Sequence, residues 1–413
     1  MTDLKPADTD ALDRQDPLAA KRGAFDLPEG VIYLDGNSLG PLPKGVKERI
    51  AETVTAEWGE MLIRGWNDAG WFTAPQRTGD RIGRLIGAPP GSVTVADNTS
   101  TNVFKCLSAA LAMRPDRKVI LSDSGNFPTD LYIAQGLIAG LDQGHELRIA
   151  NPDQVFDELD EDVAVLMITE VDYRTGRRHD MAGLTRRAHE LGALTMWDLA
   201  HSAGAFDVDL TGAGADFAVG CGYKYLNGGP GAPAFLYVRP SRQDRVRPLL
   251  AGWMGHEAPF AFDIDYRPLE GVGRMRVGTP PVISLAGLDA ALDVWDDVDM
   301  AEIRAKSVAL ADLFIEEVER RCAGHGLTLI TPRDPAMRGS HVSFSHPEGY
   351  AVVQALIAEG VIGDFRAPDV MRFGFTPLYL RFAETVKAAE TIARVFDQRL
   401  WDTAAHKTRA AVT

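Results

Sequence analysis

The chain has 413 residues, of which 45% are hydrophobic and 24% charged, and its formal net charge is −15. A chain of this length can bury a large core and form more than one domain. The acidic excess argues against a nucleic-acid-binding role, because phosphate neutralisation requires clustered Lys and Arg. No apolar run reaches the roughly 18 residues that a membrane span needs, and residues 1–25 lack the apolar segment of a signal peptide. We therefore expect neither nucleic acid nor membrane as a partner.

The cysteines indicate the redox environment. Cys106, Cys221 and Cys322 are odd in number and scattered, and no CxxC pair occurs. Disulfides and a structural zinc site are therefore not expected, and no metal centre is predicted. A reducing cytoplasm is the predicted location.

The first predicted elements are an arm and a helix. We expect residues 1–30 to be poorly ordered or loosely docked, and residues 45–63 to form a helix. From about residue 93, short apolar runs alternate with helical stretches. Near-continuous apolar strands between helices indicate a mostly parallel sheet covered on both faces. The six strands expected there span residues 119–122, 146–149, 163–169, 194–197, 217–219 and 234–238.

The pattern changes after a long helical region at about 281–323. Beyond it, a smaller α+β domain is expected, with strands at 327–331, 341–345 and 370–375 and helices near 349–360 and 382–399. The prediction is an α/β chain in three parts. These are an N-terminal arm (1–45) associated with the small domain, a large domain (46–300) and a small C-terminal domain (301–413).

A glycine-dense turn after an apolar strand places Lys224 between two tyrosines. Asp198 and His201 lie just past the preceding strand, where open α/β sheets bind ligands. Pyridoxal phosphate (PLP) chemistry requires this combination. A lysine holds the cofactor aldehyde as a Schiff base, and a carboxylate keeps the pyridine nitrogen protonated so that the ring accepts electrons. Without Lys224, the alternative interpretation is that Asp198 caps a helix and His201 is a satisfied core histidine.

Two further turns suit a phosphorylated, planar cofactor. Residues 97–102 (DNTSTN) open a helix-like run, and free N–H groups with Ser and Thr hydroxyls form an anion site there. Plain N-capping by these polar residues is the alternative. Phe127 precedes Pro128 on a strand-to-helix turn, where an aromatic ring can stack on a flat cofactor. The alternative is a proline in the first helical turn with Phe127 as a hydrophobic staple.

Arg372 lies inside an otherwise apolar strand. A guanidinium there is costly unless it meets an anion, and it is the usual clamp for an amino-acid carboxylate. The alternative is an edge-strand arginine that extends to water. Several aromatic residues lie in loop-like stretches. Core packing is the expected role of any one of them, whereas the group together indicates a flat aromatic ligand or a subunit interface. They are Trp66, Trp71, Phe72, Trp253 and Phe260.

Together these residues resemble the kynureninase family, fold-type-I PLP enzymes of tryptophan catabolism. The resemblance covers most of the chain, from Leu34 to Arg372. It rests on six motifs in order and at matching spacing: 36–41 (GNSLGP), 127–130 (FPTD), 198–201 (DLAH), 223–227 (YKYLN), 252–257 (GWMGHE) and 278–281 (GTPP). Each is weak alone, and the ordered set is specific.

The resemblance implies hydrolysis of the Cβ–Cγ bond of L-kynurenine to anthranilate and L-alanine. It makes Lys224 the Schiff-base lysine, pairs Asp198 with the pyridinium nitrogen, and places Tyr223 beside both lysine and phosphate as a proton relay. A site shared across two chains implies a homodimer. The resemblance also places Phe127 on the cofactor ring and lines the pocket with Asp130, Thr169 and His201. The phosphate is held by Ser100, Thr101 and Tyr223, with Trp253 and Thr279 reaching it from the partner subunit. Arg372 receives the substrate carboxylate, near Asn37 and Ser38.

Two positions depart from the animal-type pattern. Trp66 stands where those enzymes have a histidine, and Thr279 where they have an asparagine. Both positions border the aryl ring of the substrate in the family. The loss of two groups able to hydrogen-bond a ring hydroxyl predicts a preference for L-kynurenine over 3-hydroxykynurenine.

The nearest alternative is a cysteine desulfurase or selenocysteine lyase on the same fold. Those enzymes typically have His directly before the Schiff-base lysine, where this chain has Tyr223, and carry a nucleophilic Cys in a C-terminal loop. Here Cys322 lies in a predicted helix. A non-catalytic PLP-binding protein is a second alternative, and it predicts that the lysine or the carboxylate clamp is missing. Both Lys224 and Arg372 are present.

Overall fold

The computed structural model describes residues 8–409, which form two compact units. Unit 1 contains the described residues up to Lys44, together with Arg174–Arg177 and the chain from Val294 onward. Unit 2 contains Gly45–Tyr173 and Arg178–Asp293. Among these described residues, no helix combines the length and apolar character needed to cross a membrane.

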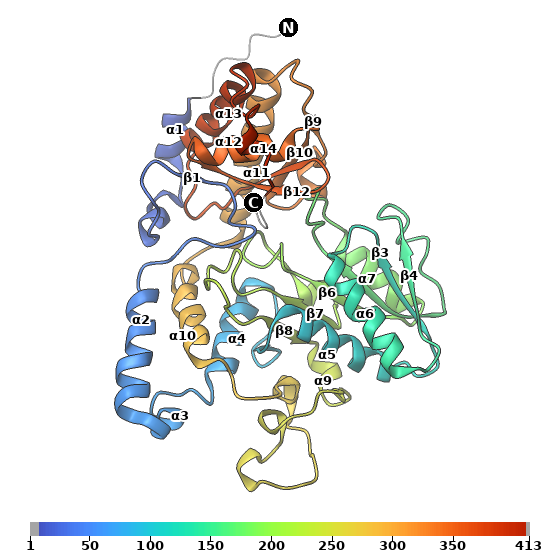
Figure 1. Ribbon diagram of the computed structural model, residues 1–413. Coiled ribbons are helices and arrows are strands. Elements are labelled where there is room, and N and C mark those ends of the chain that lie inside the picture. Colours follow the sequence, from blue (N-terminus) through green and yellow to red (C-terminus); the bar gives the residue numbers. More distant parts are fainter. Residues whose placement is uncertain (1–7, 410–413) are drawn as a thin grey trace. The chain divides into compact units, whose positions relative to one another are not determined.

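A seven-stranded sheet forms the centre of unit 2 (Figure 1, cyan to yellow-green). Five neighbouring strands are parallel, and β8 runs antiparallel to both of its neighbours, so the prediction of a mostly parallel sheet is confirmed. The strand order is β2 (Val93–Val95), β8 (Phe235–Val238), β7 (Phe217–Gly220), β6 (Leu194–Asp198), β5 (Val163–Thr169), β3 (Val119–Asp123) and β4 (Glu146–Ala150). Each predicted strand is present within one residue of its expected bounds.

Both faces of this sheet are covered, which explains its continuous apolar strands. Alternate strand residues such as Met196 and Val219 enter the core cluster with helix α5 (Thr99–Ala112) and residues of α6 (Pro128–Leu141). The next residue along β6, Trp197, points the other way and donates from Nε1 to Thr185 Oγ1 (3.1 Å) of α7 (Met181–Glu190). The period-two alternation of a strand therefore serves two helical layers.

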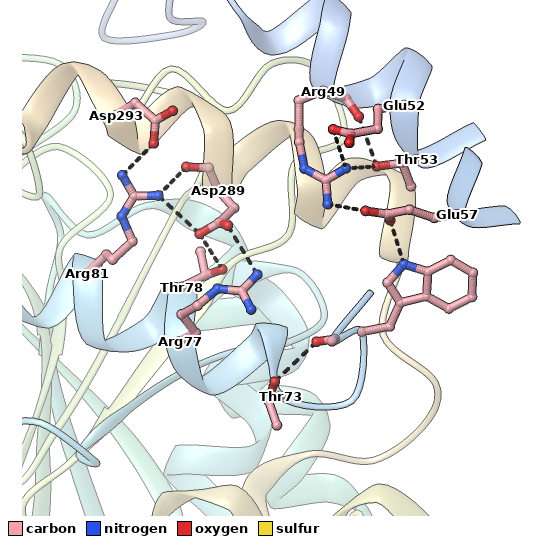
Figure 2. A network of polar contacts seen from close by, with 12 residues as sticks. Arg49, Glu52, Thr53, Glu57, Thr73, Arg77, Thr78, Arg81, Asp289 and Asp293 are labelled. Carbon is pink, nitrogen blue, oxygen red and sulfur yellow. Dashed lines mark hydrogen bonds and ion pairs between the residues drawn. The ribbon is translucent and has the colours of Figure 1, made fainter. Parts of the chain in front are cut away.

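The helix expected at 45–63 is present with a change of hydrogen bonding. It begins as α2 (Val46–Glu52) and continues as a π-helix over Thr53–Met61. Figure 2 shows the polar contacts that hold this region, in which Arg49 pairs with the buried Glu57 (2.7 Å). Glu57 in turn accepts from Trp71 Nε1 (2.7 Å).

A second set of contacts in Figure 2 joins α4 (Ala74–Leu85) to α10 (Val282–Ala291) and the residues after it. Arg81 pairs with Asp293 (2.7 Å) and Asp289 (3.2 Å), and Thr78 Oγ1 donates to Asp289 (3.0 Å). The shorter helices of this part of the chain are η3 (Leu62–Arg64), α3 (Gly65–Asp68), α8 (Leu210–Ala213), α9 (Pro240–Gln243), η4 (Trp253–Gly255), η5 (Pro259–Ala261), η6 (Gly271–Met275) and η7 (Leu292–Trp295).

Unit 1 contains an antiparallel sheet of order β12-β13-β10-β9 (Figure 1, orange to red). The strands are β9 (Thr328–Leu329), β10 (His341–Ser345), β12 (Asp364–Arg366) and β13 (Val370–Gly374), and the helices are α11 (Met300–Arg321), α12 (Gly349–Ala358), α13 (Phe382–Asp397), α14 (Ala404–Lys407) and η8 (Pro335–Met337). A separate parallel pair joins β1 (Ile32–Tyr33) to β11 (Val361–Ile362). The predicted C-terminal strands and helices are confirmed, with β9 shorter than expected.

The prediction of a loosely docked arm over residues 1–30 is wrong for the described residues, and residues 1–7 lie outside them. Helix α1 (Thr9–Gln15) is followed by η1 (Ala19–Ala24). Asp13 accepts the backbone N–H groups of Phe382 (2.7 Å) and Ala383 (3.2 Å) and so caps α13. Asp16 forms a buried pair with Lys306 (2.6 Å). The alternating charges that suggested disorder are used as specific partners of α11 and α13.

Candidate active site

The turn after β7 holds Lys224 in a defined position. Gly228 N donates to Gly222 O (2.9 Å), and Asn227 N donates to Lys224 O (2.9 Å), with Asn227 in the left-handed region (φ +59°). A Cβ on Gly222 would lie 2.3 Å from Pro233 O, so only glycine fits there. The glycines predicted around the lysine thus close a tight loop that presents the Lys224 side chain to a cavity of unit 2.

The carboxyl ends of parallel strands bring the acidic residues to the same cavity. Asp198 ends β6, where it is in register with Thr169 of β5, and Asp130 lies in the first turn of α6. Asp198 Oδ1 accepts from Ala200 N (2.8 Å), and Thr169 Oγ1 lies 3.4 Å from the Asp198 carbonyl. The helix-capping alternative for Asp198 is therefore wrong, because residues 199–206 form turns and no helix begins there, and Asp198 instead closes a local turn at the cavity.

Asp130 and Asp198 form a buried carboxyl pair. Burial raises the pKa of Asp198, although Lys224 opposes that shift. Burial also raises the pKa of Asp130 well above its usual value, and the neighbouring Asp198 raises it further. Two carboxyl groups this close and this buried favour a shared proton or a positively charged donor between them.

Lys224 lies among groups that can exchange a proton with it. Its Nζ is 3.2 Å from His201 Nε2 and 5.9 Å from the centre of the Tyr223 ring. Cys221, on the same turn, lies 3.2 Å from Thr99 Oγ1, and burial raises the pKa of its thiol. A thiol with a raised pKa is a weaker nucleophile than a free cysteine.

The polar helix start predicted as a phosphate site is the N-terminus of α5. Its N-cap is Asn98, whose Oδ1 accepts from Thr101 N (2.9 Å) and lies 3.2 Å from Thr101 Oγ1. The capping alternative is therefore realised at Thr101. Thr99 and Ser100, in contrast, face the cavity. A helix N-terminus with two cavity-facing hydroxyl residues suits an anion.

Phe127 lies at the N-cap of α6, followed by Pro128 in the first helical turn. The residue is 43% exposed, and its ring packs edge to face with that of Tyr173, with centroids 5.2 Å apart. The exposed face is part of the cavity wall. The complete set of lining residues is Asn98, Thr99, Ser100, Phe127, Thr129, Asp130, Thr169, Tyr173, Asp198, Ala200, His201, Cys221, Tyr223 and Lys224.

The remaining predicted site residues lie elsewhere. In unit 2, Trp66 belongs to α3 and contacts Trp71 edge to face at 5.9 Å. Trp253 begins the short helix η4, Thr279 lies on a loop, and both are exposed. Neither these three residues nor Thr101 line the Lys224 cavity. Arg372, Asn37 and Ser38 belong to unit 1.

Arg372 is buried at the centre of a polar cluster in unit 1. It lies on β13, between β12 and β10, so the edge-strand alternative is wrong. Its Nε donates to Asp364 Oδ1 (2.9 Å) and its Nη2 also contacts Asp364 Oδ2. Its Nη2 donates to Ser38 Oγ (2.8 Å), and the Asn37 carboxamide oxygen accepts from Nε (3.0 Å) in the orientation that satisfies that amide. The anion expected beside this arginine is supplied first by the protein itself.

Asp35 adds a second acid to this cluster. Burial, with a contribution from Asp364, raises the pKa of Asp35 to about 7. The pKa of Asp364 is lowered, because Arg372 and Arg366 outweigh the effect of its burial. The backbone at Gly36 lies close to the Tyr379 side chain. Only glycine fits there, since a Cβ would lie 2.4 Å from the Tyr379 hydroxyl. The Gly-Asn-Ser motif is therefore a packing device as well as a set of ligands for Arg372.

Sequence reasoning missed several residues of both clusters. Thr99, Tyr173 and Cys221 line the cavity, and their nearness to predicted residues along the chain was the available signal. Asp364 was also missed, although residues 364–372 carry a hairpin signal (Pro368-Asp369) that pairs Asp364 with Arg372. Asp35 gave no signal, because its charge state follows from burial and from neighbours that are distant in sequence, such as Asp364.

Comparison with solved structures defines the class. A cysteine desulfurase from Escherichia coli superposes with a TM-score of 0.75 at 20% identity, covering 92% of this chain and 98% of that one. A C-DES variant with glycine covalently linked to its PLP cofactor gives the same TM-score and identity, covering 93% and 99%. This chain therefore has the fold of the fold-type-I PLP-dependent enzymes.

Sequence comparison defines the family. Residues 303–392 match the model of the kynureninase C-terminal domain. The kynureninase of Pseudomonas fluorescens is 54% identical over 408 residues, covering 98% of both chains. The kynureninase of Burkholderia pseudomallei (strain K96243) shows the same identity and coverage. The chain belongs to the kynureninase family, and the resemblance inferred from its motifs is confirmed.

Proposed function

We propose that this protein is a PLP-dependent hydrolase that cleaves the Cβ–Cγ bond of L-kynurenine to give anthranilate and L-alanine, a step of tryptophan degradation. The observation that carries the proposal is the Lys224 cavity with its Asp198–Asp130 pair, in a chain 54% identical to a kynureninase over 98% of its length. The desulfurase alternative is not favoured, because the three cysteines are all buried.

The residues of the cavity fit PLP. A buried carboxyl pair with raised pKa values suits a protonated pyridine nitrogen, which offers both a positive charge and a hydrogen. Lys224 would hold the cofactor covalently, and the exposed face of Phe127 would cover its ring. Thr99, Ser100 and the α5 N-terminus would hold its phosphate. Thr101 and Tyr223, and Trp253 and Thr279 from a partner chain, remain part of the proposed phosphate site.

When bound, PLP supplies an electron sink for the electron pair left at the substrate Cα. The protein supplies proton transfer. The amine of Lys224 removes the Cα proton, and its neighbour His201, 3.2 Å away, lies in reach to exchange that proton. Asp198 would face the ring nitrogen and keep it protonated, and Asp130 and Thr169 line the same cavity. Tyr223, beside Lys224, is proposed to relay a proton through the cofactor phosphate.

Arg372 is proposed to bind the substrate carboxylate. Its pairing with Asp364 fixes the plane of the guanidinium, so that the orientation is set before the substrate arrives. Ser38 and Asn37 contact the same guanidinium and complete this binding site.

The aryl ring is proposed to meet Trp66 and Thr279, which favours L-kynurenine over 3-hydroxykynurenine. Neither an indole ring nor a short hydroxyl side chain replaces the paired hydrogen bonds of a histidine and an asparagine. Sites that leave a polar group unpaired discriminate strongly. The test is kcat/KM for both substrates, and a value for 3-hydroxykynurenine equal to or above that for kynurenine contradicts this part of the proposal.

A homodimer is proposed as the functional unit. The aromatic loop (residues 249–266) carries several exposed apolar side chains, with Phe262 79% and Ile264 97% exposed. Trp253 contacts Phe260 edge to face at 5.8 Å within this loop. Apolar surface of this kind marks an association site.

Light scattering during size exclusion tests the dimer, and it should give twice the mass of one chain. The dimer of a Phe262→Ser/Ile264→Ser variant should dissociate at a higher protein concentration than the wild-type dimer does. The matched control is Ile149→Ser, which removes an exposed apolar residue (44%) outside the loop. A wild-type protein that is monomeric at micromolar concentration contradicts the proposal.

The division into an arm (1–45), a cofactor domain (46–300) and a small domain (301–413) is proposed as the functional organisation. It is supported by the two compact units and by the docking of α1 on α13. A cytoplasmic location is proposed as well, supported by three buried cysteines that form no disulfide.

The reaction is tested on the purified protein loaded with PLP and given L-kynurenine. Anthranilate and alanine are quantified by chromatography. Equal amounts of the two products are expected, with none from Lys224→Ala. Formation of alanine without anthranilate, or of neither, contradicts the proposed reaction.

A further inference from the structure

We propose that His179 is a positioning residue for Phe127, acting through Asp123, and that it thereby controls how tightly and in what orientation the cofactor ring is held. This inference rests on the proposed function, because it concerns the same cavity. His179 does not line that cavity.

The contact between His179 and Asp123 is short and is buried from solvent. His179 Nε2 lies 2.6 Å from Asp123 Oδ2, and the two residues are 7% and 0% exposed. The bond forms with a neutral imidazole carrying its proton on Nε2 and also with an imidazolium. A buried carboxylate that loses such a donor has no access to water, so it would draw the surrounding backbone toward a new partner.

Asp123 starts the turn that carries Phe127. It is the last residue of β3, and its other oxygen, Oδ1, accepts from Gly125 N (2.9 Å). Asp172 lies against the same turn, since a Cβ on Gly125 would be 2.6 Å from Asp172 Oδ2. The Asp123 carboxylate therefore connects two parts of the chain: Oδ1 holds the turn at Gly125, and Oδ2 contacts His179.

The rest of the turn passes this constraint to Phe127. Asn126 is buried, and its Oδ1 accepts from Phe127 N (2.7 Å) while its Nδ2 donates to Ser122 Oγ (3.0 Å). Pro128 then begins α6 and fixes the exit of the chain. Phe127 therefore has a fixed backbone at both sides, and its ring position depends on where Asp123 and Asn126 hold the turn.

His179 is itself anchored to the neighbouring strand end. Its backbone N–H donates to Glu170 O (2.9 Å), directly after β5, and Val171 pairs with Arg178 in an antiparallel bridge. Arg178 also pairs with the fully buried Glu170 (3.0 Å). His179 accordingly ties the Phe127 turn to the segment that carries Thr169 into the cavity wall.

Substitution of His179 should weaken PLP binding and change the orientation of the bound cofactor ring. His179→Ala should raise the dissociation constant for PLP about tenfold, because a misplaced aromatic stacking contact loses ~1.4 kcal/mol of binding free energy. It should also change the visible circular dichroism of the bound cofactor, which reports the asymmetry of the ring environment. His179→Gln, whose amide nitrogen can still donate to Asp123, should restore most of both signals.

The chain provides a matched control. His189 Nε2 lies 2.7 Å from Oδ2 of the fully buried Asp216, a second histidine–aspartate pair in unit 2 that does not join a cavity-lining turn. His189→Ala should lower the melting temperature while leaving the PLP dissociation constant and the visible dichroism unchanged. Equal effects of the two alanine variants on PLP would show a general loss of stability and overturn the inference.

A double-mutant cycle with Phe127→Leu separates positioning from structure. Once the stacking ring is removed, a second change at His179 should add less than twofold to the PLP dissociation constant. Additive effects would overturn the proposal. If His179→Ala does not yield folded protein, His179→Asn takes its place in the cycle. A wild-type protein that binds no PLP would instead contradict the proposed function, so the two failures are distinguishable.

Discussion

Asp35 should make unit 1 less stable as the pH rises. Its carboxyl group faces Asp364, which raises its pKa, and Ser38, Arg372 and Arg366, which lower it, and burial dominates. The pKa is raised from 3.8 to about 7. The folded protein therefore keeps a proton, between about pH 4 and 7, that the unfolded chain releases.

The size of the effect follows from this difference. A raised acid pKa contributes stability that is complete below the unfolded pKa and is lost as the pH rises through the folded pKa. About three units at 1.36 kcal/mol each give about 4 kcal/mol lost between pH 4 and 8. Asp364, whose pKa is lowered, contributes in the opposite direction and only below about pH 4, so the two windows are separate.

The perturbation is Asp35→Asn, which is neutral at every pH. The variant should match the wild type near pH 4 and exceed its melting temperature by about 10 °C at pH 8, since 1 kcal/mol corresponds to about 2–4 °C in a unit of this size. Thermal melts by circular dichroism from pH 4 to 8 measure this difference. The control is Glu29→Gln, which removes an exposed carboxylate of the same unit. A difference between Asp35→Asn and wild type that does not change with pH would refute the reasoning.

Three other predictions concern the reaction. Lys224→Ala should abolish both turnover and the visible absorbance of lysine-bound cofactor, with an unchanged far-ultraviolet spectrum; a remaining absorbance band would assign the covalent link to another residue. Tyr223→Phe should lower kcat about tenfold or more while PLP still binds, and wild-type turnover would exclude the proton relay. Arg372→Lys keeps the charge beside Asp364 but loses the planar pair of donors, so KM for kynurenine should rise about tenfold with a smaller change in kcat. An unchanged KM would place the carboxylate site elsewhere.

The sheet of unit 2 was predictable because both of its faces are buried. Continuous apolar runs such as 163–169 have no reason to exist on a half-exposed strand, and helical stretches between them imply crossover connections. The antiparallel direction of β8 was not predictable, since an apolar run carries no sign of its direction. The change from α2 to a π-helix at Thr53 likewise depends on tertiary partners such as the Arg49–Glu57 pair.

The candidate site was predictable where its residues share a motif and not where they meet through space. Lys224, Asp198 and His201 were found because each follows a strand and has a recognisable chemical task. Asp123 and His179 are 56 positions apart, and neither falls in a motif. The arm at residues 8–30 was misjudged for the same reason, because Asp13 and Asp16 find partners in α13 and α11.

The most direct test is a paired assay of one preparation of the PLP-loaded protein. Anthranilate fluorescence is recorded with L-kynurenine, and sulfide release is recorded with L-cysteine, each as kcat/KM. We expect efficient anthranilate formation and no sulfide above that of Lys224→Ala. Release of sulfide, with kynurenine bound but not cleaved, would retain the fold and contradict the kynurenine-cleaving function.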